Sequence, residues 1–505
     1  MADQRLNKLA KLLVNYSTGV KEGDFVFVSC NEVANPWLTE VVKEATKAGA
    51  HVEYILESEE AKEARFKFST KDQLLSGNLI METMLEKADV WLSAWGARNT
   101  RAFSNIDSEK IKDSRAGEKG WRKFYSGRMG DGSLRWCGTQ FPTYADAQEA
   151  SMSFTEYEDF VYGAGLLDHE DPVAEWNRVS KEQERWVKYL DTKKELHILA
   201  EGTDIKVSVE GRKWINCDGR VNFPDGEIFT SPVENKINGH ITFSFPGIYA
   251  EKEIEGIELE VKDGKVVSYK AKKGEDLLKA LLETDEGASH FGEVAIGTNY
   301  GIKKFTRNML FDEKIGGTVH MAIGDSMPEA GGKNRSSLHW DMLCDMRNGG
   351  RIYADGELFY ENGEFKKEDL NECAELFVKT FSKEPWNEPW DFENAKKRLN
   401  DVVLTPGFRG AVLRNDEKIE GVILGNLEQW YDGEHFCVKE FFVDSSSQGK
   451  GTGKKLLNAL ENILMEKEVG VIHFWTMKGS TAEAFYNKRG YEIPKELIMM
   501  RKKLK

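Results

Sequence analysis

The sequence is poor in cysteine and contains no long apolar run. Its six cysteines are scattered over 505 residues without a Cys-x-x-Cys pair, a pattern that fits neither a disulfide framework nor a thiolate zinc site, so we expect reduced, structural thiols. No stretch approaches the ~18 consecutive apolar residues that a membrane-spanning helix needs. The opening residues, MADQRLNKLAKLLVNYS, space their apolar side chains at helical intervals instead of gathering them as a signal peptide does, which favours a cytoplasmic protein without a membrane segment.

Basic residues are scarce relative to acidic ones. The formal net charge is -15 at pH 7, and no basic stripe is long enough to offset it, so the chain would repel a phosphate backbone. A nucleic-acid partner is therefore not expected. The composition is that of a folded protein, with 40% hydrophobic residues and a mean hydropathy of -0.53. A chain of 505 residues corresponds to about three domains.

The succession of patterns along the chain predicts three domains of α/β and α+β class. Residues 1–192 combine helical patterns with short apolar strands such as 25–28, which indicates an N-terminal α/β domain. Residues 193–365 are rich in β-branched runs and glycine-containing turns, which indicates a β-rich domain. The turn-like pairs Asp355-Gly356 and Asn362-Gly363 then precede a new helix start and a third α/β domain over residues 366–505.

Carboxylates and imidazoles gather in the middle domain, close to glycines. The strings PDGEIFTSP, FGEVAIGTN, FDEKIGGTVHMAIG and GGKNRSSLHWDM contribute Glu227, Glu293, Glu313, His320, His339 and Asp341. His339 and Asp341 are two residues apart, so they share a face of an extended segment. Any one of the six is more simply a solvent-facing acid or a hydrogen-bonded histidine, but unpaired carboxylates in apolar settings are costly to bury without a cation. Oxygen and nitrogen donors without thiolate suit zinc, cobalt, manganese or magnesium.

The succession of these four motifs resembles the thermophilic aminopeptidase family, which includes the aminopeptidase T and S types, from about residue 5 to about residue 365. The resemblance implies that the six residues above bind two divalent metal ions and that the protein is a homodimer. It also implies an enzyme that removes N-terminal residues from a peptide substrate, by metal activation of a water and binding of the free α-amine. Glu293 is then the first candidate for the base that takes the proton of the water.

One position departs from that family pattern. Members commonly carry a tyrosine after the His-x-Ala-x-Gly motif, where it can donate a hydrogen bond to an oxyanion, but the string GDSMPE places Met327 there. A thioether cannot donate that bond. Because loss of one such donor can cost ~100-fold in rate, we expect hydrolysis to be reduced unless another donor replaces it.

A glycine-rich turn opens a helix in the C-terminal domain. The run Gln448-Gly449-Lys450-Gly451-Thr452-Gly453 follows the strand FCVKEFFV, and such a turn presents backbone N–H groups and the positive end of a helix dipole to a pyrophosphate. The spacing matches neither the P-loop nor the Rossmann pattern. Together with VIHFWTM and AEAFYNKRGY, the run resembles the GNAT family of N-acetyltransferases over about residues 368–503.

That second resemblance implies an acetyl-CoA site and an amine acceptor. By carry-over, the cofactor pyrophosphate would be bound by Gln448, Gly449, Lys450, Gly451 and Gly453, and Tyr486 would protonate the leaving thiolate. Glu440, on the strand that enters the loop, is a candidate base for the amine or an ordinary surface acid.

Three accounts of the whole chain stay open. The protein is a bifunctional enzyme, an aminopeptidase whose GNAT domain only binds CoA as a regulator, or an acetyltransferase on a peptidase-like metal-binding scaffold with weak or lost hydrolysis. The complete ligand set favours the first two, because an intact set is harder to explain in a scaffold than one altered accessory donor.

Overall fold

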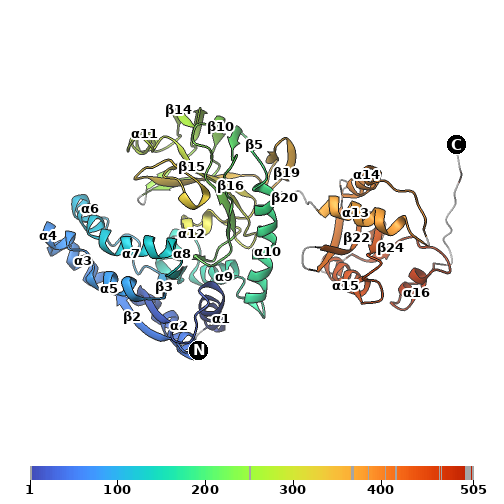
Figure 1. Ribbon diagram of the computed structural model, residues 1–505, viewed down its shortest axis with the longest axis horizontal. Helices are drawn as coiled ribbons and strands as arrows, with labels where there is room; N and C mark the ends of the chain where they lie inside the picture. Colours follow the sequence, from blue (N-terminus) through green and yellow to red (C-terminus); the bar gives the residue numbers. More distant parts are fainter. Residues whose placement is uncertain are drawn as a thin grey trace. The chain divides into compact units, whose positions relative to one another are not determined.

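The structure is a computed structural model that describes residues 3–249, 252–365 and 369–494, apart from positions 385, 404, 406, 416, 417, 466 and 468, together with Lys502. The chain divides into two compact units, Met1–Lys366 and Lys367–Lys505, which are described separately. Figure 1 shows the elements of both units. None of the described helices is long and apolar enough to cross a membrane.

The first part of unit 1 is built on a parallel sheet of order β2-β1-β3-β4-β8. Its strands are β1 (Phe25–Asn31), β2 (His51–Glu57), β3 (Val90–Trp95), β4 (Arg135–Gln140) and β8 (Asn222–Phe223). Strands β1 and β3 are almost entirely buried, as parallel strands covered on both faces are. Their apolar side chains pack with α1 and α2 into one core that includes Val26, Val28 and Trp37.

Helices connect and cover these strands. They are α1 (Gln4–Leu12), η1 (Leu13–Ser17), η2 (Glu32–Ala34), α2 (Asn35–Lys47), α3 (Glu59–Phe68), α4 (Lys71–Leu75), α5 (Leu79–Lys87), α6 (Ser108–Gly117), α7 (Lys119–Gly130), α8 (Tyr144–Glu149), α9 (Phe154–Ala164) and α10 (Pro172–Leu190). Helix α10 begins with Asp171 as N-cap and a proline in its first turn, and it packs against β7 and β9 of the following sheet.

The second part of unit 1 is β-rich. An eight-stranded sheet has the order β14 (Lys265–Lys270), β13 (Glu258–Lys262), β10 (Ile237–Thr242), β6 (Thr203–Ser208), β5 (Glu195–Ala200), β18 (Arg351–Ala354), β19 (Glu357–Glu361) and β20 (Glu364–Phe365). A five-stranded sheet has the order β17 (His339–Asp345), β16 (Thr318–Gly324), β15 (Phe291–Gly297), β9 (Glu227–Thr230) and β7 (Ile215–Cys217). The remaining elements are β11 (Gly247–Tyr249), β12 (Lys252–Ile254), α11 (Glu275–Leu282), α12 (Met309–Asp312) and η3 (Pro328–Ala330).

A single apolar core joins the strands of the two β-rich sheets. It includes Ile198 and Ile205 of the larger sheet and Val294 and Met321 of the smaller one, all fully buried. Strands β15 and β16 are buried along their whole length, so a polar side chain on either of them lies inside the protein.

Unit 2 is a four-stranded sheet with helices on its faces. The strand order is β21 (Phe408–Asn415), β22 (Lys418–Trp430), β23 (Gly433–Val443) and β24 (Val471–His473), and β23 pairs with β24 in parallel over only three residues. The helices are α13 (Asp369–Phe381), α14 (Phe392–Val403), α15 (Thr452–Met465) and α16 (Thr481–Asn487). One core cluster contains α13 and α14 residues and the other contains α15 residues, so these helices cover different parts of the sheet.

The predicted mixed α/β and α+β fold class is confirmed by these sheets and helices. Strand β8 pairs with β4 of the N-terminal sheet although it lies at residues 222–223. The division at residues 192 and 365 into three domains stays a prediction.

Candidate metal centre

Five of the six predicted ligands lie on one face of the five-stranded sheet. Glu227 begins β9, Glu293 lies in β15, His320 in β16, and His339 and Asp341 in β17. The register aligns Glu227 with Gly297, His320 with Ala295, and Glu293 and Asp341 with Ala322. Residues opposite each other in antiparallel strands, and residues two apart in one strand, share a face. The sheet therefore brings together side chains that are up to 114 positions apart in the sequence, the separation of Glu227 and Asp341.

Glycines next to these strands make room for the cluster. Gly226, with φ of +121°, turns the chain into β9 directly before Glu227, a backbone conformation that favours glycine. A Cβ atom at Gly297 would lie 2.2 Å from the carbonyl oxygen of Ile315. Gly297 thus allows the segment that carries Glu313 to approach the face of the sheet.

The sixth predicted ligand, Glu313, is the C-terminal cap residue of α12 and is followed by a fully buried lysine. The Lys314 ammonium contacts the Glu313 carboxylate and lies 3.6 Å from Glu227 Oε1 and 4.0 Å from Asp225 Oδ1. Asp225 is itself buried and accepts hydrogen bonds from the backbone N–H groups of Gly219 and Gly226, both at 3.1 Å. Lys314 is an internal counter-ion for three carboxylates.

The two imidazoles lie among the remaining carboxylates. His320 Nε2 is 3.3 Å from Glu227 Oε2 and 3.4 Å from Glu293 Oε1. His339 Nε2 is 3.4 Å from Glu293 Oε2 and 3.5 Å from Asp341 Oδ2. The Glu293 carboxylate therefore lies between the two histidines, with one oxygen toward each.

Burial and crowding shift the protonation of this cluster. Burial raises the pKa of Glu227 to about 8 and that of Asp225 to about 7, although the Lys314 charge opposes both shifts. Burial acts in the opposite direction on His320, but contact with Glu293 and the charge of Glu227 outweigh it and raise its pKa to about 9. The pKa of His339 is raised as well, against burial, by Asp341 and Glu293. The two imidazoles therefore hold their protons at neutral pH, and a divalent cation must displace these protons to bind.

The residues fit a divalent-cation site. Four buried atoms of the cluster make no hydrogen bond with any described residue, namely Glu227 Oε2, Asp341 Oδ1, and Nδ1 and Nε2 of His320. Orphaned buried donors and acceptors of this kind require an explanation, and a metal ion supplies one. His339 Nδ1 lies 2.9 Å from the backbone oxygen of Asp325, so as an N–H donor it leaves Nε2 directed at Glu293 and Asp341.

Two buried charges of the site were missed in the sequence, Asp225 and Lys314. Asp225 precedes Gly226 in the Pro-Asp-Gly turn and reads as an ordinary turn residue. Lys314 directly follows a predicted ligand, but lysine is almost never fully buried unless it is paired, so a lysine in a string such as FDEKIGG predicts a solvent-exposed side chain. No local pattern marks either residue, because the burial of both charges depends on contacts between segments that are about 90 positions apart in the sequence.

Met327 lies after β16, directly before η3. Its backbone N–H donates to Ser231 Oγ at 2.9 Å, and that hydroxyl in turn lies 3.4 Å from the Met327 carbonyl oxygen. The fully buried Ser231 hydroxyl is therefore already engaged with the backbone. The family resemblance leads us to expect a tyrosine at this position, and the reduced hydrolysis expected from Met327 stays a prediction.

The predicted cofactor loop of unit 2 precedes α15. Gly449 and Gly451 have φ of +77° and +89°, a region that favours glycine, and the loop residues Gln448 to Gly451 are exposed. Gln448 Nε2 donates to the Val443 carbonyl oxygen at 3.1 Å, which fixes the start of the loop to the end of β23. Gly453 lies in the first turn of α15. The loop thus presents backbone N–H groups at a helix N-terminus.

The two predicted catalytic residues of unit 2 lie on β23 and α16. Burial raises the pKa of Glu440, although Arg398 Nε donates to Glu440 Oε1 at 2.8 Å and opposes that shift. Burial also raises the pKa of Tyr486 to about 12, so its phenol keeps its proton at neutral pH. The Tyr486 ring lies 6.2 Å from the ring of Phe441, the residue after Glu440.

Comparison with known proteins assigns both parts of the chain. Residues 2–365 match the family described as thermophilic metalloprotease (M29), and residues 370–491 match the acetyltransferase (GNAT) family. Aminopeptidase 2 of Geobacillus stearothermophilus is 28% identical over 353 residues, which cover 65% of this chain and 84% of that protein. Aminopeptidase T of Thermus aquaticus is 26% identical over 367 residues, covering 65% of this chain and 86% of that protein.

A solved structure shares the fold of the first part. Wild-type AmpT from Thermus thermophilus aligns with a TM-score of 0.64 and 22% identity, covering 72% of this chain and 99% of that chain. For the C-terminal part, an acetyltransferase of Sodalis glossinidius (strain morsitans) is 22% identical over 142 residues, which cover 28% of this chain and 92% of that protein. The chain therefore belongs to the thermophilic metalloprotease (M29) family, and it carries a GNAT acetyltransferase domain after the metalloprotease region.

Proposed function

We propose that the chain is an aminopeptidase in which two divalent cations, zinc, cobalt, manganese or magnesium, are bound by Glu227, Glu293, Glu313, His320, His339 and Asp341. The observation that carries the proposal is the convergence of buried carboxylates and imidazoles, several without hydrogen bonds, on one sheet face. When bound, such ions polarise a carbonyl, activate a water and accept a free α-amine. A peptide with a free N-terminus is therefore the proposed substrate.

Glu293 is the proposed general base. Its carboxylate is buried between His320 and His339, and although burial raises its pKa, the contacts with both imidazoles outweigh this and lower it. An ionised, buried carboxylate can take a proton from the attacking water and return it to the leaving amine. Hydrolysis would thus use one chain residue for both proton transfers.

The test compares short peptides that have free or acetylated N-termini, using the purified full chain with chelator and with each of the four metals restored. The matched variants are Glu293→Gln and Glu286→Gln, since Glu286 is exposed and lies outside the cluster. We expect chelator-sensitive cleavage of unblocked peptides by wild type and Glu286→Gln, and at least ~100-fold slower cleavage by Glu293→Gln. Cleavage of blocked peptides at the same rate would contradict recognition of the free α-amine.

We also propose that the C-terminal domain transfers an acetyl group from acetyl-CoA to an amine. The support is the exposed glycine-rich turn at α15, a protonated Tyr486 and the half-buried Glu440. Arg398, the partner of Glu440, also lines a cavity of about 560 Å³ with Trp390 and Asp401, which offers a place for the acceptor. Tyr486 would protonate the leaving thiolate, and Glu440 would accept the proton of the incoming amine.

Acetyl-CoA binding is tested by calorimetry on the full chain and on Gly451→Val, whose positive φ a branched side chain cannot easily adopt. Turnover is tested with a panel of amines and with Glu440→Gln. We expect the first variant to lose binding, and the second to keep binding but lose most of its turnover. Binding without turnover on any amine would instead favour a CoA-binding regulator.

The alternative function is an acetyltransferase, or a CoA-binding regulator, on a peptidase-like scaffold. It is favoured by one specific observation, the thioether of Met327 in place of a hydroxyl donor. Acetyl transfer with no peptide hydrolysis under any of the four metals would select this alternative.

We further propose a homodimer, on the basis of the family resemblance alone, and a cytoplasmic location, on the basis of the sequence pattern. Sedimentation equilibrium of the purified chain should give twice the monomer mass, and a monomer at micromolar concentration would contradict this.

A further inference from the structure

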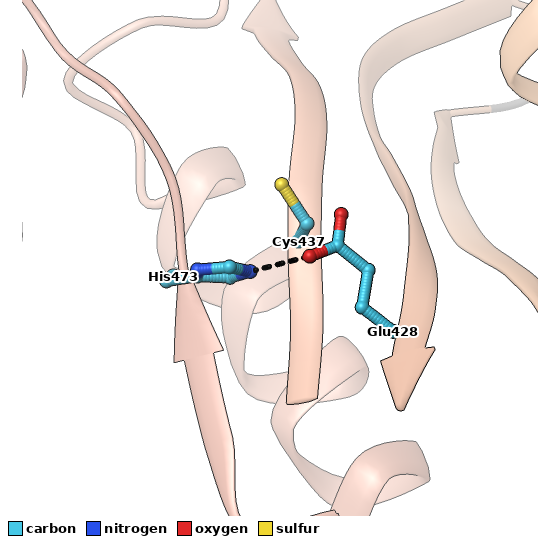
Figure 2. Close-up of side chains that lie close together, drawn as sticks. All are labelled: Glu428, Cys437 and His473. Atoms are coloured by element: carbon cyan, nitrogen blue, oxygen red, sulfur yellow. Dashed lines mark ion pairs between the residues drawn. The ribbon is translucent and has the colours of Figure 1, made fainter. Parts of the chain in front are cut away.

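A second cluster of metal-binding side chains lies in unit 2, outside the residues assigned above. Glu428 comes from β22, Cys437 from β23 and His473 from β24, three neighbouring strands of one sheet. Figure 2 shows the side chains of Glu428 and His473 pointing toward each other beside Cys437. Cys437 is paired directly with His473 on one side and with Asn426, two residues before Glu428, on the other. The three side chains therefore share a sheet face.

The spacing of the donor atoms is close to that of ligands on one ion. His473 Nε2 lies 3.4 Å from Glu428 Oε2, and one ligand atom from each of the three residues lies within 4.8 Å of the other two. Two ligands at ~2.0–2.1 Å from a tetrahedral zinc ion are about 3.4 Å apart, and a thiolate at ~2.3 Å is about 3.6 Å from a nitrogen ligand. The imidazole and carboxylate are already at that separation, and the thiol lies within 4.8 Å of both.

Two further observations indicate that the cluster attracts a cation. Nε2 of His473 is buried and makes no hydrogen bond within the described residues. The ammonium of Lys439 lies 3.2 Å from both Cys437 Sγ and Glu428 Oε1, so a positive charge already sits between thiol and carboxylate. The same ammonium also lies 6.0 Å from the ring centroid of Trp475, a distance at which an aromatic face attracts a cation.

We propose that Glu428, Cys437 and His473 form a binding site for a borderline-soft divalent cation, with zinc as the natural ligand, and that the ion competes with the Lys439 ammonium. A thiolate, an imidazole and a carboxylate are the donor types that zinc accepts, and three protein ligands leave a fourth position open. The ion would cross-link β22, β23 and β24 at the place where the pairing of β23 with β24 ends, at Cys437 and His473.

Neighbouring side chains leave these donors available. His435 is engaged with Asp432 at 3.0 Å and is stacked on Trp430, with ring centroids 5.0 Å apart. Burial raises the pKa of the Cys437 thiol although Lys439 opposes this, so the thiol is protonated at neutral pH and binding releases its proton. The sequence has no Cys-x-x-Cys spacing that would predict this site, because the three proposed ligands come from three different strands.

Cobalt absorption of the full chain tests the proposal without reference to activity. After chelator treatment and dialysis, Co²⁺ is titrated into wild type, Cys437→Ser and Cys217→Ser. Cys217 is the matched control, because it is the cysteine near the other acidic cluster. We expect a near-ultraviolet thiolate-to-cobalt band in wild type and Cys217→Ser, its loss in Cys437→Ser, and its loss on addition of Zn²⁺, which binds such sites more tightly.

Lys439→Met and His473→Gln make the test quantitative. Removal of the competing ammonium should lower the Co²⁺ concentration at half-saturation several-fold, whereas loss of the imidazole should raise it at least ~10-fold, because even outer-shell changes cost 10–100-fold. Lys439→Met keeps all three donors, so it remains informative if Cys437→Ser fails to fold. Absence of the band in wild type, its survival in folded Cys437→Ser, or unchanged affinity in Lys439→Met would each overturn the proposal.

Discussion

Replacement of Lys314 by methionine tests whether the buried ammonium is the counter-ion of the acidic cluster. The fully buried Lys314 Nζ has three carboxylates within 4.0 Å, those of Asp225, Glu227 and Glu313. Each such contact is worth about 4 kcal/mol at an effective dielectric constant of 20. The net loss is smaller, because the pKa values of about 7 for Asp225 and about 8 for Glu227 allow the cluster to take up a proton near neutrality.

The expected cost is therefore that of breaking one buried pair, about 3–5 kcal/mol in the free energy of unfolding. The measurement is hydrogen exchange of peptides from β9 and β15 in chelated protein at increasing urea, which reports on this unit alone. Lys303→Met is the control, because Lys303 is exposed and a substitution there should change stability by no more than ~0.5 kcal/mol.

A divalent cation should reduce the cost of Lys314→Met, because it supplies positive charge to the same carboxylates. The experiment is repeated with zinc or manganese at saturating concentration. A loss below about 1 kcal/mol in chelated protein would refute the view that the Lys314 ammonium neutralises this cluster.

Three other predictions concern single side chains. Met327→Tyr should raise the kcat of peptide hydrolysis by ~10–100-fold if its hydroxyl reaches the oxyanion, and unchanged kcat would exclude that position as a donor site. Phe291→Ala, at a fully buried core position two residues before Glu293, should cost about 3–5 kcal/mol in urea unfolding. In unit 2, burial opposes ionisation of Asp444, but the Lys379 ammonium at 2.5 Å and Ser446 lower the pKa of the Asp444 carboxyl. The stability that the ionised carboxylate contributes is therefore present above the ordinary aspartate pKa of about 3.9 and is lost as the pH falls below that value. Asp444→Asn should thus destabilise unit 2 by roughly 1–3 kcal/mol at pH 7 and by less at pH 2, as followed by calorimetry.

Family and fold class could be predicted because they depend on short, contiguous motifs. The motif strings around Glu227, Glu293 and His320 each combine a glycine turn with an apolar strand, and such local patterns are readable from one sequence. Both predicted family memberships are confirmed by the matches over residues 2–365 and 370–491. The metal and cofactor roles of the individual residues stay predictions.

Buried charge could not be predicted, because it depends on contacts between distant segments. Lys314 lies about 90 positions after Asp225 and Glu227, and only the fold shows that its ammonium contacts their carboxylates. Cys437 and His473 are likewise brought together by strand pairing across 36 positions of the sequence. In both clusters the missing information is the strand register, which no local spacing contains.

The register also explains why the motifs around the ligands are rich in glycine and alanine. Each ligand on β9, β15, β16 and β17 faces a small residue in a neighbouring strand: Gly297 beside Glu227, Ala295 beside His320, Ala322 between Glu293 and Asp341, and Gly324 beside His339. Larger side chains at these four positions would fill the face on which the carboxylates and imidazoles converge. The small residues of the GEVAIG and HMAIG strings therefore belong to the candidate site as much as the proposed ligands do, because they keep open the space that a bound cation would occupy.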